Sequence, residues 1–470
     1  MIPGEKEMSM ENNNYMVLGN DNYYSMDCIK TQKNNNVLVV GASGSGKTRS
    51  IVSPNLMMAT GSYIVSDPKG NLHHKYKRYL EKRGYIVKKL DFTDPMNSAH
   101  YNFLQYIREP KDITKMAHML AYNEAGAHYD PFWDQSSELL LSSLISYCIE
   151  ALDKEKQNFE YIEKLLQLGK RDCDLSSNDS LLSTLMRNYA KKHPKSWAVK
   201  QFEDANVAPD RTFNCILITL ITKLRAFCSE EITYMTSSDD IDLPSIGQKR
   251  TALFVVVSDT DRSMDPLANL FFTQAMNELC WYADHECKDC RLPVPVRFIL
   301  DDFATNCRID EFPRMIASIR SRGISTMIMI QAESQLARAY GNDGRTIIGN
   351  CDTYIYLGGS DLETAKSIAE RCNIPVGKIL AMEVGRNIIF RRGEVPKYCQ
   401  NLDLCEFEQQ LNFRNPNTVE KRKIDSRSLV ERLAGPEKPT DEEELPDLSE
   451  AKLKAQMDKK SKIDASWLFA

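Results

Sequence analysis

The stretch GASGSGKT, which follows the apolar run VLVV, contains residue types whose spacing can bind phosphate. Gly41, Gly46, Lys47 and Thr48 satisfy the pattern G-x-x-x-x-G-K-[ST] between an expected strand and an expected helix. In such a loop the glycines let backbone N–H groups curl round phosphates, the lysine reaches the β- and γ-phosphates, and the hydroxyl binds Mg²⁺. A chance glycine turn is the alternative, and the flanking strand and helix favour a nucleotide site. The predicted nucleotide-binding residues are Gly41, Ala42, Ser43, Gly44, Ser45, Gly46, Lys47 and Thr48.

A pair of carboxylates ends a second apolar run, in VRFILDDFA. A phosphate-binding loop needs a carboxylate on a neighbouring strand to help hold the metal, and strand ends are where such a sheet meets its ligand. We therefore expect Asp301 to bind Mg²⁺ together with Thr48, and Asp302 to orient or deprotonate the attacking water. The alternative is a pair that merely ends a strand at the surface, because apolar runs that end in acids are common.

Two further polar positions flank the run STMIMIQ. Gln331 ends this expected strand, where a glutamine can sense the γ-phosphate or position water; a buried amide bonded to the backbone is the alternative. Arg320 and Arg322 lie just before the strand, in SIRSRGIS. One of them can reach the nucleotide of a neighbouring subunit as an arginine finger, although a lone arginine usually lies on a solvated face.

Three other stretches carry weaker signals. Asp67, in SDPKGN, follows the second expected strand on the edge of the predicted site, and a tight turn explains it equally well. Cys287 and Cys290 have C-x-x-C spacing, but the sequence offers no second pair to complete a zinc site, so the end of a helix and a loop is the preferred interpretation. Trp133, in HYDPFWDQ, can stack on a base, although such clusters more often anchor a domain by packing.

The elements that position these side chains follow from the alternation of apolar runs. Strand and helix patterns alternate from Val37 to about Asp91 and again from Thr251 onward, which implies parallel strands joined by crossover helices. Between these parts the sequence has long segments with helical periodicity and few strand signals. We predict an α/β fold, a P-loop NTPase domain with a mostly parallel sheet, that carries an inserted all-α domain.

The predicted domain bounds follow from the same patterns. Residues 1–101 form the first part of the NTPase domain, 102–242 the inserted all-α domain and 243–412 the second part of the NTPase domain. Residues 413–470 are highly charged and poor in apolar residues, which predicts a flexible tail with short helical pieces.

Composition sets limits on the kind of protein. A chain of 470 residues with 42% hydrophobic and 27% charged residues is ordinary for a globular protein of two or three domains. The formal net charge of −5 argues against a chain coated in positive charge, while local basic patches for nucleic acid remain compatible with it. Thirteen scattered cysteines, with no signal-peptide pattern and no membrane-spanning run, favour a reduced, cytosolic compartment.

Several motifs in fixed order resemble one protein family. NNNVLVVGASGSGKT, SDPKGN, HYNF, DPFW, FILDDFA, SIRSRGIS, IQAESQL and IIGNCDTYIYLGG occur in this order between about Asp27 and Leu402. Together they resemble the type IV secretion coupling proteins, the TraG-like ATPases of conjugative DNA transfer. The resemblance is closest to the soluble part of members from Gram-positive mobile elements. Several ordered motifs are more specific than a phosphate loop alone.

The resemblance implies a RecA-like motor domain with an inserted all-α domain, which uses ATP and Mg²⁺. Such proteins are expected to form homo-hexameric rings, to receive single-stranded DNA bound to a relaxase, and to drive it into the type IV secretion channel. Lys47, Thr48 and Asp301 match the nucleotide and Mg²⁺ residues of the family pattern. Gln331 matches its sensor glutamine and Arg320 its trans-acting arginine. The all-α domain is where family members are thought to meet the relaxosome.

The sequence departs from the family pattern in two features, its N-terminus and one residue. The family usually has N-terminal transmembrane helices, whereas this sequence begins close to the motor. We expect a cytoplasmic protein at the inner face of the cell membrane, either anchored by a separate membrane protein or working in solution. The second departure is Asp302, where the family normally has glutamate. One fewer methylene draws the carboxylate back by about 1.5 Å, and misplacement of that order can cost roughly 10²-fold in rate.

Three functions are compatible with these patterns. The leading hypothesis is a DNA-translocating ATPase that couples a relaxosome to a secretion channel. The second is a nucleotide-binding substrate receptor with little or no hydrolysis, which both departures from the family pattern motivate. The third is a double-stranded DNA pump with the same motor fold, against which the helical insertion and DPFW argue.

Overall fold

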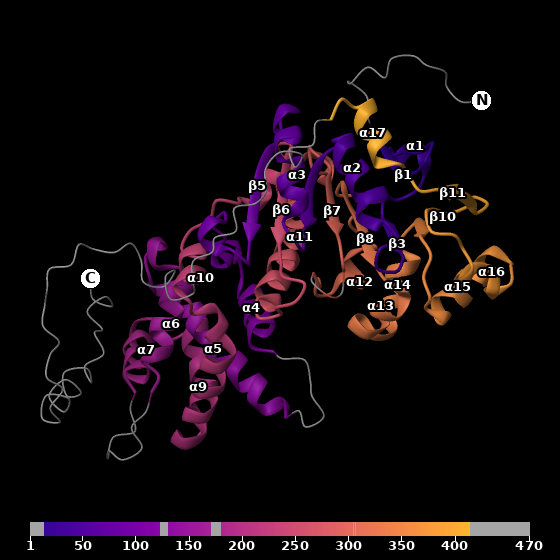
Figure 1. Cartoon of the computed structure of the whole chain (residues 1–470). Helices are drawn as coiled ribbons and strands as arrows, with labels where there is room; N and C mark the ends of the chain where they lie inside the picture. The colour runs from indigo at the N-terminus through magenta and orange to yellow at the C-terminus, as the bar shows by residue number, and fades with distance from the viewer. Residues whose placement is uncertain (1–13, 123–129, 171–179, 304, 306, 414–470) are drawn as a thin grey trace, which may run out of the picture. The chain divides into compact units, whose positions relative to one another are not determined.

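The computed structural model describes residues 14–122, 130–170, 180–303, 305 and 307–413, all of which lie in one compact unit, Met1–Asn415 (Figure 1). Its centre is a nine-stranded sheet with the strand order β11-β10-β9-β3-β8-β7-β4-β6-β5. The seven strands from β9 to β5 in this order pair in parallel, and β10 and β11 add an antiparallel edge. The strands are β3 (Val37–Val40), β4 (Ser62–Ser66), β5 (Ile86–Asp91), β6 (Thr251–Val256), β7 (Val296–Leu300), β8 (Ile324–Ile330), β9 (Thr353–Tyr356), β10 (Arg386–Arg391) and β11 (Lys397–Gln400).

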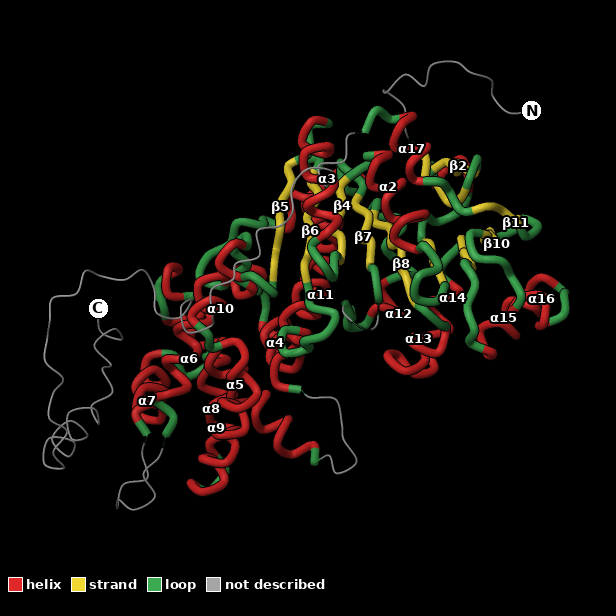
Figure 2. The backbone as a smooth tube through the Cα atoms, viewed as in Figure 1, coloured by secondary structure: helices red, strands yellow, loops and turns green. Residues whose placement is uncertain are grey.

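Continuous apolar runs make the central strands. Every residue of β3, β4, β6, β7, β8 and β9 is buried, as expected for parallel strands that are covered on both faces. The mostly parallel α/β sheet predicted from the sequence is therefore confirmed, and Figure 2 shows the strands side by side with helices around them.

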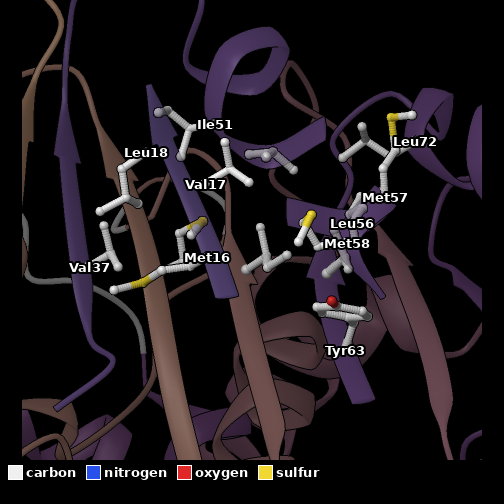
Figure 3. Packing of buried hydrophobic residues seen from close by; sticks show 14 of the residues in the cluster. Met16, Val17, Leu18, Val37, Ile51, Leu56, Met57, Met58, Tyr63 and Leu72 are labelled. Atoms are coloured by element: carbon white, nitrogen blue, oxygen red, sulfur yellow. The ribbon is translucent and has the colours of Figure 1, made fainter. Parts of the chain in front are cut away.

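A hairpin of β1 (Tyr15–Gly19) and β2 (Asn22–Ser25) covers the helix that follows β3. Met16, Val17 and Leu18 share one apolar core with residues of α2 (Ser53–Met58), as Figure 3 shows. Asn55 ties the two elements together, because its side chain accepts a hydrogen bond from the Val17 N–H (3.1 Å) and donates one to the Val17 carbonyl oxygen (2.7 Å). The sequence interpretation did not identify this hairpin.

The remaining helices of the sheet region include α3, which follows β4, and α11, which precedes β7. They are α1 (Cys28–Thr31), α3 (Asn71–Lys82), α11 (Asp265–Glu286), α12 (Phe312–Met315), α13 (Glu333–Tyr340), α14 (Gly344–Gly349), α15 (Leu362–Cys372), α16 (Val376–Leu380) and α17 (Leu404–Gln410). Because α11 ends at Glu286 and β7 begins at Val296, Cys287 and Cys290 lie at a helix end and in the following loop, as predicted. None of the helices in the described ranges combines the length and the apolar character that crossing a membrane requires.

The described residues between 102 and 242 contain helices as their only regular elements. These are α4 (Pro110–Ala121), α5 (Pro131–Ala151), α6 (Phe159–Gln167), α7 (Leu181–Lys192), α8 (Trp197–Asn206), α9 (Asp210–Leu224) and α10 (Glu230–Met235), with short 3₁₀ turns. The long α5 begins with Asp130 as N-cap and Pro131 at its first position, and it packs on α4, α8 and α9. Trp133 lies in its first turn with its ring edge-to-face against Phe132.

The chain enters and leaves this helical region at one place. Tyr106 donates a hydrogen bond from its hydroxyl to Asp239 (2.6 Å), and the Asn102 and Asp242 N–H groups donate to the same carboxylate (3.3 and 3.0 Å). The Leu243 N–H donates to the Tyr106 hydroxyl oxygen (3.3 Å). An insertion into another domain needs such adjacent ends. The bounds 102 and 242 stay a prediction, and residues 414–470 of the predicted tail lie outside the described residues.

Candidate nucleotide-binding site

The loop after β3 has the backbone of a phosphate cradle. Gly44 and Gly46 have φ of 77° and 92°, a region that is strained for residues with a side chain. Gly41 is required for a different reason, because a Cβ there would lie 2.5 Å from Ser45 Oγ and 2.9 Å from the Leu357 Cβ. Both glycines that define the sequence motif, Gly41 and Gly46, are therefore also needed by this backbone, as is Gly44 between them.

Lys47 points back into the loop that carries it. Its Nζ donates hydrogen bonds to the carbonyl oxygens of Gly41 (2.7 Å) and Ala42 (3.2 Å). Burial lowers the pKa of Lys47, and the charges of Asp302 and Asp301 act to raise it. The ammonium group is thus held inside the loop and within electrostatic reach of both carboxylates.

Thr48 joins the loop to the carboxylate at the end of β7. The Thr48 hydroxyl donates a hydrogen bond to Asp301 Oδ2 (2.7 Å). β8 lies between β3 and β7 in the sheet, so this hydrogen bond spans one intervening strand, and Thr48 is the first residue of the helical turn Thr48–Val52. Hydroxyl and carboxylate oxygens are the ligands that Mg²⁺ prefers, and the two side chains stand side by side at the loop, so the residues present fit a magnesium ion.

Asp301 is itself buried, which affects its titration. Burial raises the pKa of Asp301, the hydrogen bond from Thr48 acts to lower it, and the charge of Asp302 adds to the rise. The structure thus brings together Lys47, Thr48 and Asp301 as the sequence pattern predicts.

Asp302 occupies an unusual backbone conformation beside this pair. Its φ is 52°, in the left-handed region, and its N–H donates a hydrogen bond to Asp301 Oδ1 (3.1 Å). Aspartate tolerates this region better than most residues with a side chain. The turn therefore gives a local reason for an aspartate at a position where the family pattern has glutamate.

Gln331 lies at the same carboxyl ends of the parallel strands as Thr48 and Asp301. It directly follows β8, the strand between the loop strand β3 and the Asp301 strand β7, and its side chain is exposed. Its backbone N–H donates a hydrogen bond to Gln335 Oε1 (2.7 Å). The strand order places Gln331 between the two halves of the site, and its role as a sensor stays a prediction.

The structure does not bring Arg320 to the loop of its own chain. Arg320 precedes β8 and therefore lies at the amino-terminal ends of the parallel strands, whereas the loop lies at their carboxyl ends. Its Nη2 donates a hydrogen bond to the Cys28 carbonyl oxygen (2.9 Å). Arg322 forms a two-pronged ion pair with Asp284 of α11 (2.8 and 2.7 Å). Arg320 is thus the exposed arginine of the pair, and only a neighbouring subunit could use it in a nucleotide site.

Asp67 is explained by the turn that follows β4. Its carboxylate accepts a hydrogen bond from the His73 N–H (2.9 Å) in the first turn of α3, and its carbonyl oxygen accepts one from the Gly70 N–H (3.0 Å). Burial raises the pKa of Asp67, and the charge of nearby Asp301 adds to this. The tight-turn interpretation accounts for its contacts.

One contact to the loop was not found from the sequence. Asn401, which directly follows β11, points its side-chain Nδ2 at the Ser45 carbonyl oxygen (3.4 Å). No motif marks this asparagine, and it lies 356 positions along the chain from Ser45. Only the pairing of β9, β10 and β11 brings it there.

Comparison with known proteins settles the family. Residues 5–376, or 372 of the 470, match the family model described as "Type IV secretory system Conjugative DNA transfer". The chain belongs to that family. The resemblance inferred from the ordered motifs is therefore confirmed.

Curated relatives in the conjugative DNA transfer family are distant in sequence. The VirD4 protein of Rhizobium rhizogenes is 24% identical over 344 residues, which cover 71% of this chain and 48% of the relative. The type IV secretion system-coupling protein VirD4 of Bartonella henselae is 20% identical over 369 residues, which cover 76% and 56%. The chain thus spans about half the length of the curated relatives it matches.

Solved structures show the same fold. The bacterial conjugative coupling protein TrwBΔN70 has a TM-score of 0.60 at 14% identity, over 85% of this chain and 89% of that chain. The plasmid coupling protein TrwB in complex with ADP and Mg²⁺ has a TM-score of 0.58 at 14% identity, over 78% and 85%. The likeness confirms the predicted fold class, a RecA-like α/β domain combined with a helical region.

Proposed function

We propose that this chain is an ATP-dependent coupling protein that recruits a relaxase-bound single strand of DNA and drives its transfer through a type IV secretion channel. The observation that carries the proposal is the hydrogen bond between Thr48 and Asp301 beside a loop whose glycines have the required backbone. A glycine turn without a ligand needs no carboxylate at that hydroxyl. Membership of the conjugative DNA transfer family supplies the secretion context.

The residues of the site have distinct roles in this proposal. Lys47 binds the β- and γ-phosphates of ATP, and Thr48 and Asp301 hold the Mg²⁺ ion. The ion, when bound, neutralises charge that develops on the phosphate oxygens. Asp302 orients or deprotonates the attacking water, and Gln331 senses the γ-phosphate from the adjacent strand end. The TrwB structures described with ADP and Mg²⁺ and with an ATP analogue support ATP and Mg²⁺ as the ligands here.

The proposal includes a homo-hexameric ring in which Arg320 serves the next subunit. Arg320 lies at the start of β8 and the loop lies at the ends of the strands. The seven residues of β8 between them span roughly 23 Å at 3.3 Å per residue. An arginine at that distance acts on a nucleotide only in trans. We place the protein at the cytoplasmic face of the cell membrane.

ATP hydrolysis by the full chain, with and without single-stranded DNA, tests the proposal. We expect DNA-stimulated turnover that is lost in Lys47→Ala, because this variant lacks the phosphate-binding ammonium. Turnover of the wild-type chain no higher than that of Lys47→Ala would overturn the motor.

A nucleotide-binding receptor is the second candidate, and Asp302 is the observation that favours it. The shorter carboxylate, on a backbone with φ of 52°, is set back from the place where a glutamate would act. If the wild-type chain binds ATP without turnover and Asp302→Glu restores turnover, the chain is a receptor built on a motor fold. Stimulation by double-stranded DNA alone would instead indicate a double-stranded DNA pump.

A further inference from the structure

A segment beyond the family match lies against the phosphate loop. The match ends at residue 376, whereas β10, β11 and α17 occupy Arg386–Gln410. Asn401, between β11 and α17, has its Nδ2 3.4 Å from the Ser45 carbonyl oxygen and would lie 3.7 Å from a Cβ at Gly46. The Ser45–Gly46 peptide unit therefore contacts a side chain from the far end of the chain.

Two further hydrogen bonds hold Asn401, one at its side chain and one at its backbone. Its Oδ1 accepts a hydrogen bond from Asn387 Nδ2 (3.0 Å), and its backbone N–H donates to the Gly385 carbonyl oxygen (2.7 Å). Asn387 is 1% exposed, and its own Oδ1 has no hydrogen-bond partner among the described residues, so the bond to Asn401 is the one that its side chain makes there. Because a donor occupies Oδ1, the Nδ2 end of the Asn401 amide faces the loop.

The segment that carries Asn401 is packed on the helices next to the loop. Leu402, Leu404 and Phe407 are buried in the same apolar core as Ile51 and Val52, which directly follow the loop. A further contact joins α17 to α3 through an ion pair between Glu408 and Lys75 (2.6 Å). We call residues 401–408 the clasp.

The geometry of the peptide unit gives the contact a consequence. In a planar trans peptide the C=O and the following N–H point in opposite directions. A donor that holds the Ser45 carbonyl oxygen toward Asn401 therefore directs the Gly46 N–H to the other side. Backbone N–H groups of such a loop are the groups that bind phosphate.

We propose that Asn401 is a positioning residue of the nucleotide site, which fixes the Ser45–Gly46 peptide so that the Gly46 N–H faces the phosphates. The proposal rests on the proposed function, in that it needs nucleotide in this loop. It also makes the clasp a connection between the nucleotide and the β10–β11 edge of the sheet, which the strand order places beyond β9.

Calorimetric binding of ADP with Mg²⁺ to the full chain tests the assignment without relying on turnover. We expect Asn401→Ala to weaken ADP binding about fivefold, the effect of losing one neutral hydrogen bond. Asn401→Asp keeps the shape but places a carboxylate against the Ser45 carbonyl oxygen and near the phosphates, so we expect a loss of about tenfold or more, reduced by salt. In hydrolysis, KM for ATP should rise while kcat at saturation stays within about twofold, since the oriented Gly46 N–H binds the phosphates equally in the ground state and in the transition state.

Glu408→Gln is the matched control, because it loosens α17 without touching the loop. We expect it to bind ADP like the wild-type chain. Wild-type affinity in both Asn401 variants would overturn the assignment, as would an equal loss in Glu408→Gln, which would indicate general loosening. If the wild-type chain binds no ADP, the proposed function fails together with this inference; if it binds ADP and the Asn401 variants bind equally well, only this inference fails.

Discussion

At the scale of single residues, the site places a carboxylate where its charge is costly for the fold. Asp301 is buried, and burial raises its pKa, which means that the ionised form is less favourable in the folded chain than in the unfolded chain. The Thr48 hydroxyl compensates only in part, because it supplies one donor. A metal ion with its positive charge would relieve this cost. A raised pKa of a buried carboxylate is therefore what we expect of a cation site without its cation.

Asp301→Asn should therefore stabilise the chain in the absence of nucleotide while abolishing its Mg²⁺-dependent hydrolysis. The pKa of Asp301 is raised in the folded state, so the gain is present above that raised pKa and shrinks as the pH falls through it toward the ordinary value near 3.8. We expect a rise in Tm of roughly 2 °C at pH 7.5. Thermal denaturation between pH 4 and 8 measures it, with the exposed Asp204→Asn of α8 as control. A lower Tm for Asp301→Asn at pH 7.5 would contradict the argument.

At the scale of residues, the spacing of residue types in the sequence predicts those site residues that act close together along the chain. The pattern from Gly41 to Thr48 predicts its own backbone, because each glycine and the lysine act within eight residues. Asp301 is predictable because ligands bind at the carboxyl ends of strands, and few acidic residues directly follow an apolar run. Asn401 is not, since an asparagine after a short, exposed strand has no pattern that distinguishes it from a turn residue.

At the scale of elements, strand order decides which side chains meet. β8 lies between β3 and β7, so the ends of three adjacent strands present Lys47, Gln331 and Asp301 at one edge. Arg320 precedes β8, so the direction of this strand places it at the opposite, amino-terminal ends of the parallel strands. Parallel alternation of strands and helices predicts that these ends meet, but it does not predict which strand lies between which.

The Tyr106 hydroxyl and the Asp239 carboxylate are central to the junction of the helical region. Tyr106→Phe removes the hydroxyl that bonds to Asp239 and to the Leu243 N–H. We expect a loss of about 1–2 kcal/mol in the free energy of unfolding, because a half-buried carboxylate and a buried N–H lose a partner. Hydrogen exchange should increase at residues 101–106 and 239–243 together. Tyr15→Phe, at an exposed position in β1, is the control.

Unchanged exchange at both junction segments in Tyr106→Phe would show that the helical region is held by other contacts. The junction also illustrates a limit of sequence reasoning. Helical periodicity predicts α7 and α9 well, since each buries one face, whereas most of the second half of α5 is buried on all sides. It does not predict that Tyr106 and Asp239, 133 positions apart, meet at the base of the region.

At the scale of the whole molecule, the nucleotide site is proposed to need two chains. Arg320 lies at the edge of the sheet opposite the loop, and its guanidinium donates to the Cys28 carbonyl oxygen of its own chain. A ring would bring that edge of one subunit to the loop of the next. The requirement can be tested without knowing the ring's structure.

Mixing two inactive variants tests whether Arg320 acts in trans. Arg320→Ala retains its loop and Lys47→Ala retains its arginine, so random assembly of equal amounts should restore turnover to about a quarter of the wild-type level per chain. Turnover as a function of the mixing ratio measures this. Arg322→Ala, which loses the ion pair with Asp284 and a hydrogen bond to the Ser318 carbonyl oxygen, should remain active alone. Absence of any recovery in the mixture, with ring assembly intact, would remove Arg320 from the site.

The most direct test of the central claim is ATP-driven displacement of streptavidin from the biotinylated end of a single-stranded DNA oligonucleotide by the full chain. The account predicts displacement with ATP and Mg²⁺, none with a non-hydrolysable analogue, and none with Lys47→Ala. ATP hydrolysis without displacement, or displacement that persists in Lys47→Ala, would contradict a DNA motor powered by the loop at residues 41–48.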